Sequence, residues 1–384
     1  NSSSQNGSQP RTSFTGTSGS PRNERRVPNR IERGTALPVD LFGDEAVFEI
    51  EVADIWHRDW VFACTTDAVA EPGDFVPVMI GRQPIIMVRG DDFQVRALAN
   101  VCSHRGAPLV DCAGRASRFS CPYHAWTYDI EGELLSVPYA QPDEITHSEH
   151  GLTSFRVETW HGLVFVSLHA DVEPLHKRVA AIEPYVKPLG LDRLHHDVAG
   201  IMSEEWQANW KLIVANALDS YSHFRVHAET IEPVSPTDGS YYLAGSARAT
   251  VTGGESMERA DHVVISLPPS FVAIVYPDAM LWQSVRPLSV GRTEVTTGVA
   301  GEAASDAGAI VNLPGWDARF VDEDRAICEQ VQSNVSARWR PGPLLEIERA
   351  LGDFHAYLAW RLGDEPPEPP VISALPGSRP EPPL

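Results

Sequence analysis

Cysteine is scarce in this chain, and no stretch of it is long and apolar enough to span a membrane. Five cysteines in 384 residues are few and odd in number, which argues against a secreted scaffold held together by disulfides. A membrane helix needs about 18 apolar residues in succession, and the regions of a secretory signal peptide are missing as well. We therefore expect a soluble, cytoplasmic protein without a membrane partner, in which a cysteine with a function binds a metal.

Positive charge is also in short supply. Lys and Arg total 31 against 52 Asp and Glu, which gives a formal net charge of −21. A protein that binds duplex nucleic acid displaces counterions with basic side chains, so nucleic acid is not an expected partner. A hydrophobic content of 42% in a chain of this length predicts a globular protein with room for two domains.

The two ends of the chain differ from the rest. Residues 1–34 contain six arginines but only two glutamates and one aromatic residue, so they bury too little apolar area to offset their conformational entropy. We predict a disordered tail over residues 1–36, with an organelle transit peptide as the alternative for an Arg- and Ser-rich, acid-poor leader. Residues 364–384 hold eight prolines and are predicted to form an extended Pro-rich tail.

Between the tails the pattern changes once, near residue 170, and this predicts two domains. Residues 37–168 contain short β-type runs separated by Gly, Pro and Asp, which indicates an all-β domain. Residues 169–363 mix helical and strand patterns, which indicates an α+β domain with helices against an antiparallel sheet. The strands expected in the first domain are 61–64, 75–80, 85–89, 93–98, 155–160 and 163–168. The elements expected in the second are helices at 174–186, 206–227, 316–338 and 344–362 and strands at 241–251, 262–276, 281–285 and 293–299.

The strongest local signal is a pair of short Cys/His motifs. Cys102-Ser103-His104 is followed by Cys121-Pro122-Tyr123-His124. Two thiolates and two imidazoles can bind zinc tetrahedrally or a Rieske [2Fe–2S] cluster, in which Cys ligates one iron and His the other. Zinc fingers usually pair like with like, whereas each motif here carries one Cys and one His, which favours the cluster.

Residues 99–130 resemble the cluster-binding segment of the Rieske non-haem iron aromatic-ring-hydroxylating oxygenases. The extra cysteines of respiratory Rieske proteins are not found here, since Tyr123 stands within the second motif and Arg105 follows the first. The resemblance implies that Cys102, His104, Cys121 and His124 bind the [2Fe–2S] cluster. Gly106, Pro108 and Pro122 are expected to shape the two loops, and Trp126 to pack beneath one of them.

A second motif predicts an iron centre that would receive the electrons. His223 and His227 lie four residues apart, so on a helix both rings project from one face. The segment 209–227 resembles the mononuclear iron motif of the same oxygenases, whose Fe(II) takes two histidines and one carboxylate. The family's carboxylate lies in a late helix, in a pattern that residues 323–332 match. We expect Asp324 to be this ligand, with Asp322 and Glu323 as alternatives.

Two polar residues before the histidines also belong to the matched segment. In the family an aspartate at this place hydrogen-bonds an iron-binding histidine and links the two metal centres, a catalytic and electron-transfer role that the resemblance implies for Asp219, with Asn216 beside it. Relatives commonly place this aspartate three residues before the first histidine, whereas Asp219 precedes His223 by four. Direct ligation of iron by Asp219 therefore stays open as a second reading.

Taken together, the two motifs imply a terminal oxygenase, the alpha subunit of its system, with an all-β Rieske domain before a helix-grip-like catalytic domain. Electrons from NAD(P)H would pass through a separate reductase, with or without a ferredoxin, to the Rieske cluster and on to Fe(II), where O2 is activated. The resemblance to the family further implies hydroxylation, dihydroxylation or demethylation of a small aromatic substrate and assembly as a homotrimer. The competing functions are a Rieske-type electron carrier without oxygenase chemistry and a zinc-stabilised structural protein.

Smaller features complete the expectations. Phe271, Tyr276 and Trp282 are candidates for an aromatic pocket wall, although each is better explained as an ordinary core residue. The stretch between Cys102 and His124 contains three arginines and one aspartate, which gives it a net charge of +2. A positive charge here would attract an acidic redox partner. The arginines are Arg105, Arg115 and Arg118, and the acid is Asp111. The remaining cysteines, Cys64, Cys112 and Cys328, are predicted to be buried thiols.

Overall fold

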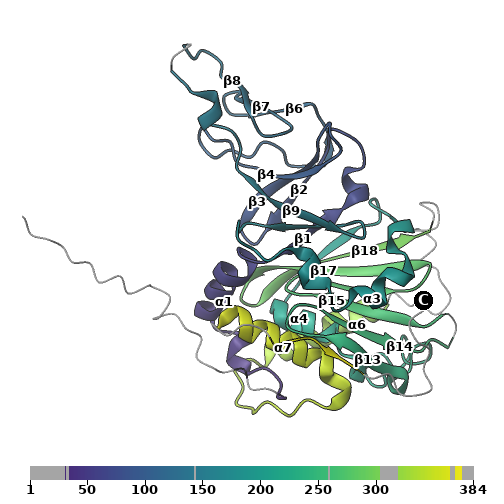
Figure 1. Ribbon diagram of the computed structural model, residues 1–384. Coiled ribbons are helices and arrows are strands. Elements are labelled where there is room, and N and C mark those ends of the chain that lie inside the picture. The colour runs from purple at the N-terminus through teal and green to yellow at the C-terminus, as the bar shows by residue number, and fades with distance from the viewer. Residues whose placement is uncertain are drawn as a thin grey trace, which may run out of the picture.

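The computed structural model describes residues 31, 34–141, 144–257, 260–302, 319–363 and 368–373. Figure 1 shows an elongated β domain standing on a larger domain built from a sheet and helices. Most of the two predicted tails lies outside the described residues. Of the N-terminal tail, Thr35 is described and forms a β-bridge with Pro343. Of the Pro-rich tail, β19 (Val371–Ile372) pairs with β13 (Ser240–Gly245).

The strands of the first domain lie between Val61 and Ser167, whereas the predicted all-β range 37–168 also contains the helix α1 (Glu45–Glu51). Its main sheet has seven strands in the order β1-β10-β9-β4-β3-β2-β5, and a small sheet β6-β7-β8 lies beyond it. The strands are β1 (Val61–Thr65), β2 (Asp74–Ile80), β3 (Gln83–Arg89), β4 (Val95–Ala99), β5 (Gly114–Arg115), β6 (Arg118–Ser120), β7 (Thr127–Asp129), β8 (Leu134–Ser136), β9 (Ser154–Trp160) and β10 (Leu163–Ser167). The strand predicted at 93–98 begins two residues later, because Phe93 has a positive φ of 62° in the preceding turn.

The second domain is α+β, with a long antiparallel sheet at its centre. The strands run in the order β11-β18-β17-β16-β15-β14-β13-β19, and β12 also pairs with β18. The remaining strands are β11 (His195–His196), β12 (Met202–Trp206), β14 (Thr250–Gly254), β15 (His262–Leu267), β16 (Phe271–Val275), β17 (Ala279–Ser289) and β18 (Arg292–Gly301). The helices are α2 (Leu175–Val179), α3 (Glu183–Val186), α4 (Trp210–Asn216), α6 (Arg319–Ser333) and α7 (Arg349–Leu362).

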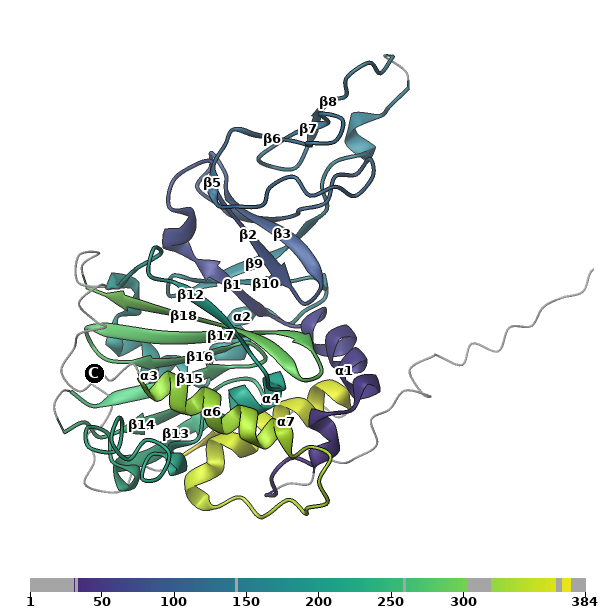
Figure 2. The same ribbon diagram turned by 180° about the vertical axis from the view of Figure 1, so that it is seen from behind.

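Helices cover both faces of this sheet. Neighbouring residues of a strand point to opposite faces, and in β16 Val272 joins the core formed with α4 and α7, whereas Phe271 joins the core formed with α2 and α3. Figure 2 shows α6 and α7 lying across the near face of the sheet. The single predicted strands at 241–251 and 262–276 are in fact hairpins, β13 with β14 and β15 with β16.

The single long helix predicted over 206–227 is wrong beyond Asn216. α4 begins where the Asn209 side chain accepts the Lys211 N–H at 3.0 Å, and it ends at Asn216. Asp219 then adopts a non-helical ψ of 87°, and its carboxylate accepts the Tyr221 N–H to start a short 3-10 turn, Ser220–Ser222. Asp side chains compete in this way with helical hydrogen bonds, so the segment carrying both histidines continues as turns.

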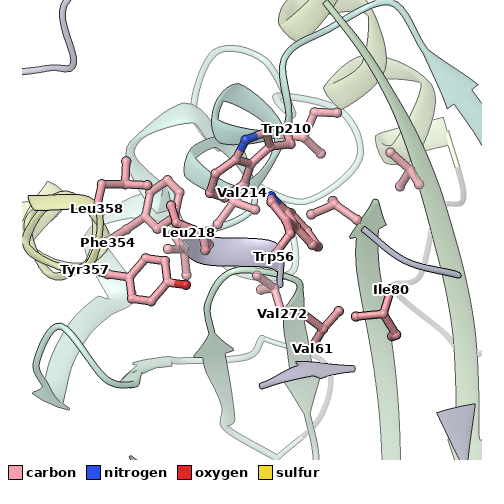
Figure 3. Close-up of a cluster of buried hydrophobic side chains, with 14 of the residues drawn as sticks. Trp56, Val61, Ile80, Trp210, Val214, Leu218, Val272, Phe354, Tyr357 and Leu358 are labelled. Atoms are coloured by element: carbon pink, nitrogen blue, oxygen red, sulfur yellow. The ribbon is translucent and has the colours of Figure 1, made fainter. Parts of the chain in front are cut away.

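A segment that precedes the β domain packs into the second domain. α1 (Glu45–Glu51) and the π-helical turn Val52–Trp56 bring Trp56 edge-on to Trp210, with ring centroids 5.3 Å apart. Figure 3 shows both rings in one buried cluster with Phe354 and Tyr357 of α7. The hydrophobic core is therefore continuous between α1, α4 and α7.

A buried ion pair fixes the start of α4 to α1. Lys211 and Glu51 are 1% and 0% exposed, and the Lys211 Nζ lies 2.7 and 2.9 Å from the two carboxylate oxygens of Glu51. Trp210 Nε1 donates to the same carboxylate at 2.8 Å. Burial lowers the pKa of Lys211, and the Glu51 carboxylate acts in the opposite direction.

Removing one member of this pair should destabilise the protein strongly, because the other charge stays buried without a partner. We expect Lys211→Met to lower the free energy of unfolding by about 3–5 kcal/mol, measured by urea denaturation followed through tryptophan fluorescence. Lys177→Met is the matched control, since Lys177 is exposed on α2, and should change stability by less than about 0.5 kcal/mol. Equal stability of the two variants would contradict the assignment.

Candidate functional site

Two loops of the β domain present the first set of predicted ligands with matching backbone geometry. The carbonyls of Cys102 and Cys121 accept the N–H of the residue four positions later, Gly106 and Ala125, at 2.9 Å each. Both of these residues have positive φ, 75° and 57°, a conformation that glycine adopts freely and alanine does not. Each loop is therefore a tight turn that returns the chain to its cysteine.

The four side chains of these loops divide by exposure. Cys102 and Cys121 are 2% and 4% exposed, whereas His104 and His124 are exposed, with ring centroids 4.7 Å apart. Trp126 stacks on the His104 ring at 4.7 Å with a 4° interplanar angle, which confirms that it packs against one of the loops. Two buried sulfurs behind two outward imidazoles form a donor set that fits a Rieske cluster.

Tyr128 adds a contact that sequence reasoning missed. Its hydroxyl lies 3.3 Å from the Cys102 Sγ and 2.9 Å from the Ser103 Oγ, and it accepts the Ser103 N–H at 3.1 Å. Burial raises the pKa of Tyr128 to about 12, so the phenol stays protonated as a hydrogen-bond donor. The signal in the sequence was its position seven residues after Cys121, directly behind the loop.

The charge of the loop region is smaller than predicted. Arg115 forms an ion pair with Asp74, 2.6 Å apart, and is thereby matched by an acid from β2. Arg105 and Arg118 remain as exposed charges. Cys112 is exposed, so its prediction as a buried thiol is wrong; it lies on a surface turn, whereas Cys64 and Cys328 are buried as expected.

The second set of predicted ligands lines a cavity in the second domain. The cavity measures about 120 Å³ and is lined by Asn216, Asp219, His223, His227 and Asp324 together with residues of the central sheet. Tyr276 and Trp282 belong to its wall, while Phe271 does not and packs instead against Phe62 at 4.9 Å. The structure thus brings together the five polar residues that the second motif singled out.

Each histidine is held through Nδ1. His223 Nδ1 lies 3.1 Å from the Ser235 carbonyl oxygen, and His227 Nδ1 lies 2.8 Å from Glu323 Oε2. Because Nδ1 is engaged on both rings, Nε2 is the nitrogen that would bind a metal on each, and on His227 it lies 3.0 Å from Asp324 Oδ1. Burial lowers the pKa of His223, as suits a neutral ligand.

Two consecutive acids of α6 hold His227 from two sides. Asp324 Oδ1 lies 3.0 Å from His227 Nε2 and also accepts from Asn216 Nδ2 at 2.6 Å, while Glu323 accepts from Thr230 Oγ1 at 2.6 Å. Burial lowers the pKa of His227, but the Asp324 and Glu323 carboxylates outweigh it and raise the pKa. Asp324 lines the cavity, Glu323 lies behind the ring and Asp322 is exposed.

The donor set fits a mononuclear iron, with two imidazole nitrogens and one carboxylate at one end of a cavity. In the described residues no three His, Cys, Asp or Glu side chains already converge as a finished site, since Asp324 contacts His227 itself and the two histidine rings are 6.0 Å apart. Asp219 lines the same cavity, and burial raises its pKa to about 6, with Glu348 adding to the effect.

Comparisons with known proteins divide the chain in the same way. Residues 59–161 match the family described as Rieske [2Fe-2S] domain, and residues 191–364 match the ring hydroxylating alpha subunit (catalytic domain). The matches imply a Rieske cluster, a mononuclear iron and O2 as co-substrate. No helix in the described ranges is long and apolar enough to cross a membrane.

Similar sequences include two bacterial oxygenase subunits. The glycine betaine monooxygenase oxygenase subunit of Pseudomonas aeruginosa is 32% identical over 204 residues, covering 53% of this chain and 47% of the relative. The anthranilate 1,2-dioxygenase large subunit of Burkholderia cepacia is 31% identical over 208 residues, covering 50% and 48%. The chain spans about half the length of the curated relatives it matches.

Two solved structures have the same fold. A quaternary ammonium Rieske monooxygenase in complex with L-carnitine superposes with a TM-score of 0.76 at 21% identity, covering 86% of this chain and 96% of that one. Naphthalene 1,2-dioxygenase with indole bound superposes with a TM-score of 0.77 at 20% identity, covering 88% and 94%.

The hydrogen bond from Tyr128 should raise the reduction potential of the cluster, because donors to the sulfurs stabilise the more negative, reduced state. One net hydrogen bond of about 1 kcal/mol corresponds to about 40 mV for a one-electron couple. We expect Tyr128→Phe to lower the midpoint potential by about that amount, measured by potentiometric titration followed by electron paramagnetic resonance.

Tyr139→Phe is the control for this measurement, since Tyr139 is 100% exposed and its hydroxyl forms no hydrogen bond with either loop in the described part of the chain. An unchanged potential in Tyr128→Phe, or an equal shift in both variants, would contradict a role for the Tyr128 hydroxyl.

Proposed function

Because this chain belongs to the family of Rieske-type ring-hydroxylating oxygenase alpha subunits, we propose that it is a terminal oxygenase, which takes electrons from a separate NAD(P)H-dependent reductase or ferredoxin and uses O2 to oxidise a small substrate. One observation carries the proposal. The chain presents two separate donor sets, an exposed one of two Cys and two His and a second one that lines a cavity.

The first donor set would hold the Rieske cluster through Cys102, Cys121, His104 and His124. When bound, the cluster supplies one electron at a time. The protein's part is to bury the two sulfur atoms and to expose the two imidazoles. This arrangement lets a partner approach the histidine side. The exposed Arg105 lies on the first loop, and the exposed Arg118 begins β6, the strand that leads into the second loop.

The second donor set would hold Fe(II) through His223, His227 and Asp324. When bound, the iron supplies the open positions at which O2 and substrate react. Glu323 fixes the orientation of His227 through Nδ1, and the Ser235 carbonyl does the same for His223. Asn216 donates to Asp324 and so holds the carboxylate at the cavity.

Asp219 is proposed as the residue that couples the two centres. It lies in the same cavity as the histidines, and its Oδ1 accepts the Tyr221 N–H at 3.1 Å. Its one-residue displacement from the family pattern is accommodated because the chain between Asn216 and His223 is a series of turns and not a helix. We assign it to electron transfer; iron ligation is the alternative that the experiment below distinguishes.

The substrate is proposed to be a small molecule, and the Tyr276 and Trp282 rings in the cavity wall support an aromatic one. The relatives named above act on glycine betaine and anthranilate by name, so one family covers aliphatic and aromatic compounds and both one-oxygen and two-oxygen insertion. A homotrimer and a cytoplasmic location also stay proposals. An electron carrier without oxygenase chemistry is disfavoured because it has no use for the second donor set.

Metal analysis separates the oxygenase from the carrier. We expect roughly three irons and two acid-labile sulfides per chain in the purified protein, against two irons for a carrier. His223→Ala should lose one iron and keep the visible spectrum of the cluster. His161→Ala serves as the control, because His161 is bonded to Glu183 and Asp192 away from the cavity, and it should keep all three. Two irons in the unaltered protein would contradict the proposal.

Replacing Asp219 by asparagine tests its coupling role. We expect Asp219→Asn to keep the iron content while substrate oxidation with a surrogate reductase falls by about 10- to 100-fold, the range for loss of a metal's outer contacts. The measurement is oxygenated product per NADH consumed, beside iron analysis. Loss of one iron in this variant would assign Asp219 as a ligand, and normal turnover would remove it from the mechanism.

A further inference from the structure

One part of the cavity wall is not used by the proposed iron chemistry. His262 is the first residue of β15, is 6% exposed and lines the cavity. It pairs with Gly254 of β14, which has no Cβ. A Cβ added there would lie only 2.5 Å from the His262 Cε1, so the imidazole occupies the space that a side chain at position 254 would need. On its other side the Tyr276 ring lies 5.3 Å away. The imidazole is therefore fixed in place by its neighbours.

This imidazole carries a buried polar atom with no partner. Among the described residues, His262 Nδ1 and Ser235 Oγ are both buried without a hydrogen bond, although buried polar groups in native proteins are nearly always paired. Both residues line the cavity. A Cβ at Gly254 would lie 2.6 Å from His262 Nε2 and 3.3 Å from Ser235 Oγ, so the imidazole and the hydroxyl flank the same space.

The residues that line the cavity indicate which kind of substrate group could hydrogen-bond His262 and Ser235. Burial lowers the pKa of His262 to about 4, so the ring is neutral and offers one donor and one acceptor. The serine hydroxyl also donates and accepts. The described lining contains neither Lys nor Arg to pair with an anionic substrate group, and a neutral imidazole and a hydroxyl match an uncharged oxygen.

We propose that His262 and Ser235 form a substrate-positioning subsite, which hydrogen-bonds an uncharged hydroxyl or carbonyl oxygen of the substrate. The inference rests on the proposed function, because it assigns the cavity to the substrate. The subsite is joined to the proposed iron-binding residues through Ser235, whose carbonyl oxygen lies 3.1 Å from His223 Nδ1 and whose hydroxyl is buried without a partner. A substrate bound there is placed beside the proposed iron ligands.

The test compares three probes of similar size, benzyl alcohol, toluene and benzoate, by equilibrium binding to the anaerobic holoprotein. We expect benzyl alcohol to bind about 3- to 10-fold more tightly than toluene, as one neutral hydrogen bond allows, and more tightly than benzoate. His262→Phe and Ser235→Ala should each reduce this preference to within about 2-fold, while His262→Gln retains part of it.

Ser266→Ala is the matched control. Ser266 is also buried with an unpartnered hydroxyl and lies on the same strand as His262, but it does not line the cavity. It should keep the full preference for benzyl alcohol. Ser235→Ala keeps the backbone carbonyl that holds His223, so its iron content should be normal, and thermal melting reports on folding of each variant.

The outcomes separate the subsite from the proposed function. No preference for benzyl alcohol over toluene in the unaltered protein, an equal loss in Ser266→Ala, or tightest binding of benzoate would each overturn the subsite. The binding measurement needs neither electrons nor O2, so an iron content of three with no preference rejects the subsite alone. An iron content of two rejects the oxygenase, whatever the binding shows.

Discussion

The buried ion pair between Glu51 and Lys211 is the constraint on which the iron-binding half of the molecule depends. It connects α1, which precedes the β domain, with the first turn of α4, and the indole of Trp210 donates to the same carboxylate. A buried pair of charges contributes little net stability compared with apolar side chains, but it permits only one arrangement of the elements that carry it. Because α4 ends at Asn216, next to the turns that hold Asp219, His223 and His227, fixing its start also fixes where those turns lie.

α6 contacts the same segment at both of its ends. The side chains of Glu329 and Gln332 accept the backbone N–H groups of Gln207 and Asn209, both at 2.9 Å. The second half of α6 is therefore hydrogen-bonded to the residues just before α4. The first half carries Glu323 and Asp324, which contact His227 on its two ring nitrogens. A single helix therefore anchors the proposed iron-binding segment at its beginning and supplies the acids that contact His227. Packing, not local helix propensity, sets the geometry of the donor set.

The motifs could be predicted from the sequence because their chemistry needs particular residue types at short, fixed spacing. The all-β and α+β character of the domains also followed from residue patterns. The prediction of one helix over 206–227 failed, because the helical spacing of His223 and His227 does not reveal that Asp219 caps a separate turn. The cavity contacts of Ser235 and His262 lie beyond sequence reasoning for a different reason: they depend on the pairing of Gly254 with His262 across two strands, and pairing partners are set by the fold.

The positions of the two donor sets in the chain bear on how electrons would move between them. In Figures 1 and 2 the small sheet β6-β7-β8 lies at the outer end of the β domain, whereas α4 and α6 lie in the other domain on the far side of the main β sheet. Cys121 and His124 stand between β6 and β7, so this loop and its exposed imidazole lie in a different domain from the cavity of their own chain. A cluster placed in this way is suited to meet another molecule: a reductase that reduces it, and a second copy of the chain whose cavity it would serve. Electron transfer between copies would need the exposed edges of His104 and His124 to come close to the cavity of another chain, which is the arrangement that the proposed homotrimer assumes.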